Sequence, residues 1–242
     1  MNQIKITEEQ KKCFKKIADR FAAKATKQGN WKSWKSNDVW LKLLGQVMIV
    51  GTSEAEKRFK CNKDLVDKMS YNRLITLTKQ GQRKDIHFVL REVKSRYCSQ
   101  DIKKCKKTNA LVHNLNYLKE VYNQNPEKMM QYLAKKSAAD RVKHIKNSFK
   151  YLGNKGARDF LMTAGLATNT IAFDSNILKI FKKIGVGLPQ NVYEKLTISS
   201  SKLYDQIEGV VIREVCKPLN LTGKQFDRLL YNNSKDILKM TF

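Results

Sequence analysis

A turn, a lysine and an aspartate stand together in the stretch YLGNKGARDFLMTAGLATNTIAFDSNIL, residues 151–178. Gly153, Lys155 and Gly156 fall in the turn, and Asp174 follows farther along. Glycine allows left-handed backbone and leaves N–H groups open, and a helix N-terminus carries a positive partial charge. The turn therefore predicts a site that binds phosphate. With an amine and a carboxylate beside it, the stretch is a candidate catalytic site.

The same residues also have an ordinary structural interpretation. Asp174 can be the N-cap of a helix that continues through Ile177, Leu178 and Phe181, and Lys155 can be one of many surface lysines. The apolar run NTIAFD before this helix is expected to be extended. On this stretch alone, the structural interpretation is favoured.

Helical periodicity dominates the segments that must position these residues. In NDVWLKLLGQVMIV, residues 37–50, apolar residues recur every three or four positions, with Asn37 or Asp38 as the expected N-cap. Strand patterns are almost absent, so we predict an all-α fold in which residues 151–156 form a hairpin between two helices. Comparable patterns predict helices over 65–77, 86–97, 110–122, 129–133 and 139–149.

The charge indicates a polyanionic partner. Lys and Arg number 48 against 22 Asp and Glu, a net charge of +26, and nucleic acid is the first candidate. The alternative is a solvated surface in which lysine is simply the common polar residue. No apolar run reaches the roughly 18 residues that a membrane span needs, so we expect an intracellular protein, in the cytoplasm and nucleoid or in a nucleus. One possible phosphate-contacting face consists of Lys103, Lys104, Lys106 and Lys107.

The sulfur and imidazole ligands show no metal-binding pattern. The five cysteines are unevenly spaced and form no CxxC pair, so we expect free thiols, no metal and no cofactor. The three histidines are far apart and are expected to lie on the surface or to pack between helices. These residues are Cys13, Cys61, Cys98, Cys105, Cys216, His87, His113 and His144.

Several segments together resemble the helix-hairpin-helix DNA glycosylases, the superfamily of endonuclease III. LGNKGARDFLMTAG and TIAFDSNIL are most similar to the small 8-oxoguanine DNA glycosylase branch of archaea and bacteria. NWKSWKSNDVWLKLLGQVMIVGTSEAEKRF resembles the first barrel helix of that branch, and LTGKQFDRLLYNNSKDILKM resembles its C-terminal helix. The resemblance covers most of 30–60 and 140–242, while 61–135 match poorly and suggest an insertion. The family hairpin has a glycine where this chain has Tyr151.

The resemblance implies a two-lobed fold. Residues 1–35 and 174–242 together would form one lobe, residues 36–173 would form the barrel lobe, and DNA would lie in the cleft between the two lobes. It implies base excision of 8-oxoguanine with AP lyase activity, in which Lys155 forms a Schiff base and Asp174 stabilises positive charge on the deoxyribose. The implied partner is double-stranded DNA with a damaged base. The protein is expected to act as a monomer and not to bind a membrane. The implied DNA-binding residues are Gly153, Asn154, Gly156, Lys150 and Asn176, and Tyr231 and Phe242 are candidates for the base pocket.

Two other functions stay open. A monofunctional glycosylase for alkylated bases would need the aspartate but not the lysine. A non-catalytic DNA-binding protein could keep only the phosphate-binding hairpin.

Overall fold

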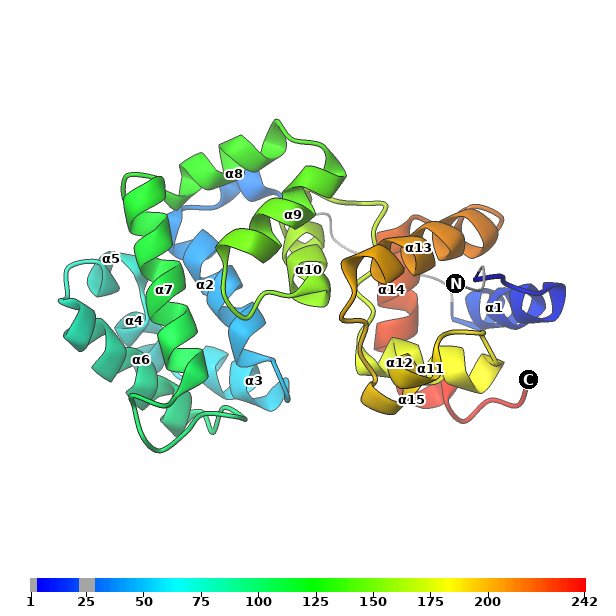
Figure 1. Cartoon of the computed structure of the whole chain (residues 1–242), viewed down its shortest axis with the longest axis horizontal. Helices are drawn as coiled ribbons and strands as arrows, with labels where there is room; N and C mark the ends of the chain where they lie inside the picture. The colour runs from blue at the N-terminus through cyan, green and yellow to red at the C-terminus, as the bar shows by residue number, and fades with distance from the viewer. Residues whose placement is uncertain (1–3, 22–28) are drawn as a thin grey trace. The chain divides into compact units, whose positions relative to one another are not determined.

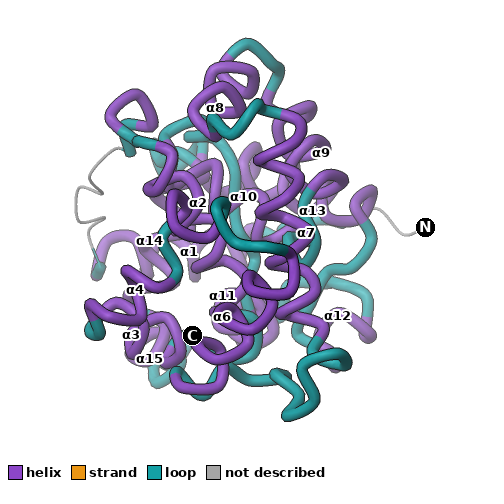
Figure 2. The backbone as a smooth tube through the Cα atoms, turned by 90° about the vertical axis from the view of Figure 1, so that its left-hand side faces the viewer, coloured by secondary structure: helices purple, strands orange, loops and turns teal. Residues whose placement is uncertain are grey.

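The computed structural model describes residues 4–21 and 29–242, and over these residues it contains helices and loops without a β-strand (Figures 1 and 2). The chain divides into two compact units. The central unit is Asn30–Phe160, and the terminal unit combines Met1–Gly29 with Leu161–Phe242. The predicted all-α fold is therefore confirmed.

The central unit contains a 3-10 turn and most of the helices. Helix α7 packs against α2, α6 and α8, and α2 also packs against α5 and α8. The elements are η1 (Trp31–Ser33), α2 (Ser36–Met48), α3 (Glu54–Lys60), α4 (Lys63–Lys68), α5 (Tyr71–Leu74), α6 (Lys79–Glu92), α7 (Lys106–Val121), α8 (Pro126–Ala134), α9 (Ala138–Ser148) and the first turns of α10 (Asn154–Ala164).

Apolar side chains at helical spacing form the core of the central unit. The face of α2 predicted to be buried is fully buried, and α2 packs against α5, α7 and α8. Trp40 on this face donates its indole N–H to the Met69 carbonyl at 2.8 Å, so its one polar atom is satisfied. Other fully buried members include Leu43, Leu44, Val47, Val89, Leu90, Leu111 and Leu115.

The terminal unit joins the N-terminal helix to the C-terminal half of the chain. Phe14 of the first helix lies between Phe181 and Phe226, with ring centroids 5.4 and 5.5 Å away. The elements are α1 (Glu8–Arg20), the last turn of α10, α11 (Ser175–Ile184), α12 (Gln190–Lys195), α13 (Ser201–Val211), the π-helix η2 (Ile212–Cys216), α14 (Gly223–Asn232) and α15 (Ser234–Ile237).

Three local predictions in the central unit are wrong. The helix expected over 86–97 ends at Glu92, and Lys94 and Tyr97 beyond it have positive φ. In the other two cases tertiary contacts override the periodic pattern. The helix expected over 65–77 is broken between α4 and α5, where the Tyr71 N–H donates to Asn37 Oδ1 at 2.8 Å. The Asn37 side chain therefore accepts a hydrogen bond from the start of α5 and is not the N-cap of α2. The N-cap is Lys35, whose N–H donates to Asp38 Oδ2 at 2.9 Å.

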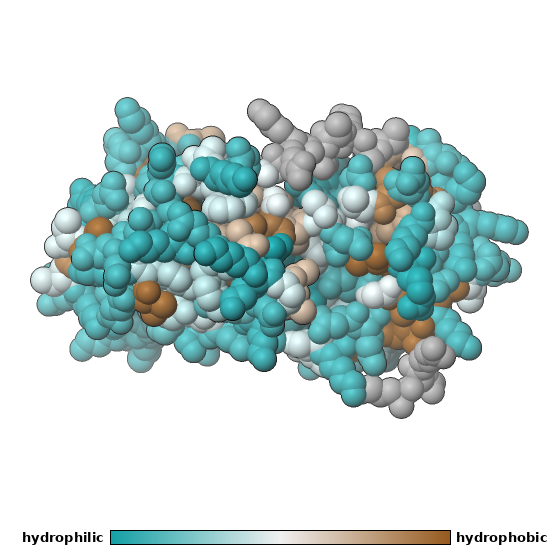
Figure 3. All heavy atoms as spheres, turned by 90° about the horizontal axis from the view of Figure 1, so that it is seen from above, coloured by the Kyte–Doolittle hydropathy of each residue, from teal (hydrophilic) through white to brown (hydrophobic). Residues whose placement is uncertain are grey.

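On the face seen in Figure 3, most side chains of both units are hydrophilic, with hydrophobic groups interspersed. Over the described residues, no helix is both long and apolar enough to cross a membrane.

Candidate active site

The connection between α9 and α10, residues 149–153, forms the turn at which the predicted hairpin was placed. Its left-handed residue is Tyr151, with φ 65°, whereas Gly153 lies outside the left-handed region. The expectation that this glycine supplies the positive φ is therefore wrong. A non-glycine residue in this region carries a conformational cost of about 1–2 kcal/mol. Phe149 and Leu152 are buried on either side of the turn and anchor it in the central unit.

Asn114 of α7 holds the backbone of this connection from outside. Its side-chain NH₂ donates to the Lys150 carbonyl at 3.0 Å, and its Oδ1 accepts from the Lys150 N–H at 2.7 Å. Asn114 is fully buried, so both bonds are shielded from water. The turn is fixed by a side chain 36 positions earlier in the sequence.

The N-terminus of α10 has the geometry of an anion site. The first bond of the ladder runs from the Ala157 N–H to the Gly153 carbonyl at 2.9 Å, so the N–H groups of residues 154–156 precede it. A Cβ added at Gly153 would meet no described atom within 4 Å, so this side of the turn is open. Asn154 is buried and Gly156 is half-buried. The dipole of α10 favours negative charge at this end.

Lys155, the second residue of α10, carries the amine that was expected to act as the nucleophile. Its Nζ lies 3.2 Å from Oδ2 of Asp159, one helical turn later, and the two side chains are 34% and 11% exposed. The same Oδ2 accepts from Nε2 of Gln46 at 3.0 Å. The amine is therefore half-buried and directed by an acidic partner that is itself fixed by α2.

Asp174 is the N-cap of α11, as the structural interpretation predicted. Its Oδ1 accepts from the N–H groups of Asn176 at 3.0 Å and Ile177 at 2.8 Å, and the residue is half-buried. Capping engages one face of the carboxylate, and the aspartate belongs to the terminal unit whereas Lys155 belongs to the central unit.

The run before Asp174 is extended, as predicted, and side chains satisfy its backbone. The Ala172 N–H donates to Oδ1 of Asp227 at 2.7 Å, and Asp227 is only 2% exposed. The Phe173 N–H donates to the hydroxyl of Tyr204 at 2.8 Å, and that hydroxyl donates to the Ile171 carbonyl at 3.0 Å.

Glu208 of α13 completes this support. Its Oε1 accepts from the Ile171 N–H at 2.8 Å and from the hydroxyl of Thr170. Near the start of the run, the Thr168 carbonyl accepts from the Lys224 N–H at 2.9 Å. Because an extended segment in an all-helical unit has no neighbouring strand, α13 and α14 supply the partners that fix the position of Asp174.

The other residues expected to contact DNA or a base lie in both units. Lys150 is exposed on the α9–α10 connection, and Asn176 is half-buried in the first turn of α11. Tyr231 near the end of α14 and Phe242 at the end of the chain are 42% and 39% exposed. Their aromatic faces are thus available to stack, which is the property that a base pocket requires.

One of the lysines expected to meet phosphate cannot do so. Lys107 is fully buried, and its Nζ donates to the carbonyls of Met48 and Val50 at 3.2 and 2.8 Å and to the hydroxyl of Ser95 at 3.0 Å. Burial lowers the pKa of Lys107 to about 8. The prediction is wrong for this residue because the lysine follows the buried face of α7.

Exposed basic residues do gather near this point. Lys103, Lys104 and Lys106 are exposed at the start of α7. A cavity of about 360 Å³ opens between α6 and this connection, and it contains no acidic side chain among its described lining residues, which are Lys79, Gln80, Arg83, Lys84, Ile102 and Lys103.

Sequence reasoning missed the residues that hold the two candidates in place. Asp159 could have been found, because a lysine and an aspartate four positions apart share one face of a helix. Asn114, Tyr204 and Asp227 had no such signal, since each acts on a backbone segment far away in the sequence.

Solved structures of 8-oxoguanine DNA glycosylases share this fold. The enzyme of Thermotoga maritima is 21% identical, with a TM-score of 0.59, over 93% of this chain and 90% of that chain. The 8-oxoguanine glycosylase/lyase of Methanocaldococcus jannaschii in complex with a 15mer DNA containing 8-oxoguanine is 17% identical, with a TM-score of 0.61, over 95% of this chain and 93% of that chain. No protein-family model matches the sequence, and a comparison with curated proteins gives no match.

Proposed function

We propose that this chain, which has the fold of 8-oxoguanine DNA glycosylases, is a base-excision repair glycosylase with AP lyase activity on oxidised purines. The observation that carries the proposal is Lys155, a half-buried amine in the first turn of α10, directly after the connection from α9. An anion site and a candidate nucleophile on one helix end fit a reaction at a deoxyribose flanked by phosphates.

In this proposal Lys155 is the nucleophile. Its neutral amine attacks C1′ of the damaged nucleotide, the glycosidic bond breaks, and the base leaves with the bonding electron pair and takes up a proton. The amine gives up a proton, and the sugar ring opens as the C1′–O4′ bond breaks and O4′ takes up a proton, which leaves a Schiff base. The Schiff base makes the proton at C2′ acidic, and loss of that proton expels the 3′ phosphate, which cleaves the strand. Asp159 acts as a positioning residue that holds the amine at the start of α10.

Asp174 has the complementary role. Breaking the glycosidic bond builds positive charge on the deoxyribose, and a fixed carboxylate lowers the energy of that state. The N–H groups that donate to its Oδ1 set its direction. The side chains of α13 and α14 that hold the preceding run preorganise it.

The charge and the turn account for DNA binding. The N-terminus of α10 and the exposed Lys150 bind phosphates beside the extruded nucleotide, and Asn176 and the aromatic Tyr231 and Phe242 contribute to binding. With a net charge of +26, affinity for undamaged duplex should fall by orders of magnitude between low and physiological salt. A salt titration that leaves the affinity unchanged would contradict this part of the proposal.

The Lys155–Asp159 ion pair also favours a second candidate. A carboxylate 3.2 Å from the amine stabilises the charged lysine, which is not a nucleophile. A monofunctional glycosylase that uses Asp174 alone, with Lys155 as a phosphate contact, is consistent with this pair.

Borohydride trapping on a duplex containing 8-oxoguanine separates the two. For a bifunctional enzyme, the wild type forms a covalent protein–DNA band and cleaves the strand, and Lys155→Gln loses both because an amide cannot attack C1′. Lys143→Gln, an exposed lysine on α9, is the control and should trap like the wild type. Asp174→Asn should keep the N-cap but lower base release by about 100-fold or more.

The outcomes assign the function unambiguously. Base release by a wild type that forms no covalent band, and base release that survives Lys155→Gln, identify the monofunctional enzyme. A wild type that neither releases 8-oxoguanine or an alkylated base nor forms a covalent band would contradict both enzymatic functions and leave DNA binding alone.

A further inference from the structure

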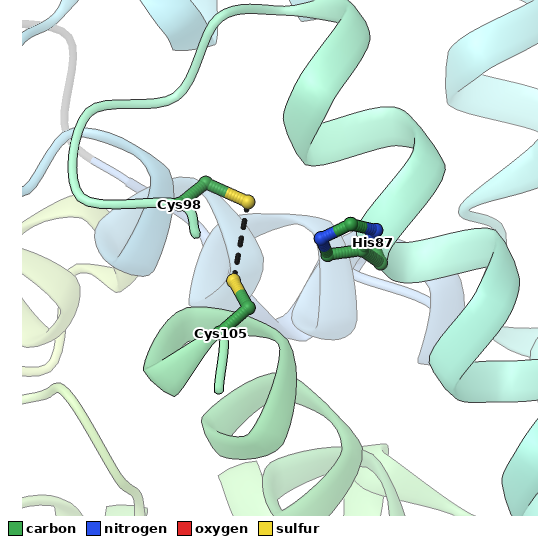
Figure 4. A group of neighbouring side chains, drawn as sticks. All are labelled: His87, Cys98 and Cys105. Atoms are coloured by element: carbon green, nitrogen blue, oxygen red, sulfur yellow. Dashed lines mark hydrogen bonds between the residues drawn. The ribbon is translucent and has the colours of Figure 1, made fainter. Parts of the chain in front are cut away.

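Three side chains with metal-binding atoms meet in the central unit, away from Lys155 in the sequence. His87 lies on α6, Cys98 lies in the connection between α6 and α7, and Cys105 is the N-cap of α7 (Figure 4). One ligand atom from each residue lies within 4.8 Å of the others. This arrangement was not visible in the spacing of the cysteines and histidines, because the chain folds back between α6 and α7.

The geometry is close to that of a bound tetrahedral ion. The two sulfur atoms are 3.1 Å apart, and Figure 4 shows the imidazole of His87 turned toward them. Zinc–sulfur bonds of about 2.3 Å place two thiolates of a tetrahedron roughly 3.8 Å apart, so zinc binding requires the two sulfur atoms to separate by about 0.7 Å. A disulfide would instead need the sulfurs to close to about 2.05 Å. A disulfide would also not account for the position of the His87 imidazole beside the two sulfur atoms.

The ligand types select the class of ion. Two thiolates and one imidazole suit zinc and similar soft or borderline cations, whereas magnesium and calcium require oxygen ligands. This group contains no carboxylate. Cys105 is buried, while Cys98 and His87 are half-buried, so a fourth ligand can come from water. Two thiolates also balance the double charge of the ion.

We propose that His87, Cys98 and Cys105 form a zinc site that staples α6 to α7 across their connection. Binding converts both thiols to thiolates and releases two protons, without any oxidation or reduction. His87 Nε2 lies 2.9 Å from the Ser99 carbonyl, so this contact would give way to the metal if Nε2 is the ligand atom.

The staple has a clear structural task. The connection it would clamp contains two left-handed non-glycine residues, Lys94 with φ 53° and Tyr97 with φ 62°. It also carries the exposed Lys103 and Lys104. A bound ion would hold this basic segment in one conformation, in the part of the sequence that matches the glycosylase pattern least.

Titration of the purified, reduced protein with Co²⁺ tests the proposal directly. We expect one equivalent to bind, with a sulfur-to-cobalt charge-transfer band and the visible spectrum of tetrahedral cobalt, and one equivalent of Zn²⁺ to displace it. Zn²⁺ should also raise the unfolding temperature. Cys98→Ser and His87→Ala should lose the band, whereas Cys61→Ser, an exposed cysteine outside the group, should keep it.

Circular dichroism checks that each variant is folded. The cobalt spectrum of the wild type tests the proposal even if a variant does not fold. A wild type that gives no charge-transfer band overturns the proposal. So does a band that survives both Cys98→Ser and His87→Ala. A disulfide-linked peptide pair containing Cys98 and Cys105, in metal-free protein purified with zinc and without reductant, would assign the two residues to a disulfide and overturn the proposal as well.

Discussion

The connection before Lys155 and the run before Asp174 both lead into a helix, but their backbones are held in different ways. Residues 149–153 make a turn that one buried side chain, Asn114, fixes through a single amide group. Residues 170–173 lie outside any helix or turn, and three side chains from α13 and α14 bind their backbone. A turn satisfies much of its own hydrogen bonding, whereas an extended segment among helices depends on remote polar residues.

This difference predicts unequal sensitivity to substitution. The two regions can be followed separately, because the three tryptophans, at positions 31, 34 and 40, all lie in the central unit. Tryptophan fluorescence therefore reports unfolding of the central unit, and far-ultraviolet circular dichroism reports both.

The largest effect is expected at the extended run. Asp227→Ala removes the acceptor of the buried Ala172 N–H and the partner that Arg228 contacts at 3.6 Å, so the free energy of unfolding should fall by about 3 kcal/mol. Asp227→Asn keeps an oxygen at this position and should lose less. The circular dichroism transition should shift in urea more than the fluorescence transition. Equal losses for the two variants would contradict the role of Asp227 as an acceptor.

A smaller effect is expected at the turn. Asn114→Ala removes both bonds to Lys150 and should lower the unfolding free energy of the central unit by about 2 kcal/mol, measured by fluorescence. Asn109→Ala is the matched control on the same helix, because Asn109 bonds to the Lys103 carbonyl at an exposed position. Its loss should stay below about 1 kcal/mol. The idea fails if the two alanine variants are equally stable.

Position 151 tests the backbone of the turn itself. Tyr151 has φ 65°, so Tyr151→Gly should be more stable than Tyr151→Ala by about 1 kcal/mol, since only glycine adopts this region without a steric cost. Both variants lose the ring, so their difference isolates the backbone term. Urea unfolding monitored by fluorescence measures it, and an alanine variant as stable as the glycine variant would show that position 151 carries no strain.

Lowering the pH is expected to give the smallest difference in stability between the two units. The three histidines all lie in the central unit, and burial, with the charge of Lys136, holds the pKa of His144 below its usual range. The unfolded chain then binds a proton at a higher pH than the folded one, so stability falls as pH drops below about 6.5. Urea midpoints at pH 7.5 and 5.5 should show this loss by fluorescence. His144→Gln should reduce it, and an unchanged pH dependence in that variant would exclude His144 as the cause.

The sequence allows most of the helices and the cap of α11 to be predicted, because these depend on local pattern. The apolar spacing of α2, the end of α10 before Gly165 and the N-cap role of Asp174 all follow from residues within a few positions. The left-handed residue could not be assigned the same way. A glycine beside it was the better local candidate, and Tyr151 adopts the conformation because Asn114 and the buried Phe149 and Leu152 hold its neighbours.

The partners of the extended run and the His87, Cys98 and Cys105 group are also outside the reach of local pattern. From the sequence, Asp227 is an ordinary polar residue of an amphipathic helix. It is buried because α14 packs beside the extended run before Asp174. His87 and Cys98 come together only where the chain reverses between α6 and α7. The role of such a residue depends on the segment that it contacts, and that segment is distant in sequence.

Helix α10 begins in the central unit, and its last turn, from Leu161, belongs to the terminal unit. Cooperative loss of the terminal unit would remove the packing of that last turn while the first turns, with Lys155, keep theirs. Amide hydrogen exchange along α10 would then step at the unit boundary instead of following the fraying of a single helix. The lysine-bearing end of the helix would belong to one cooperative folding unit and its C-terminal end to another.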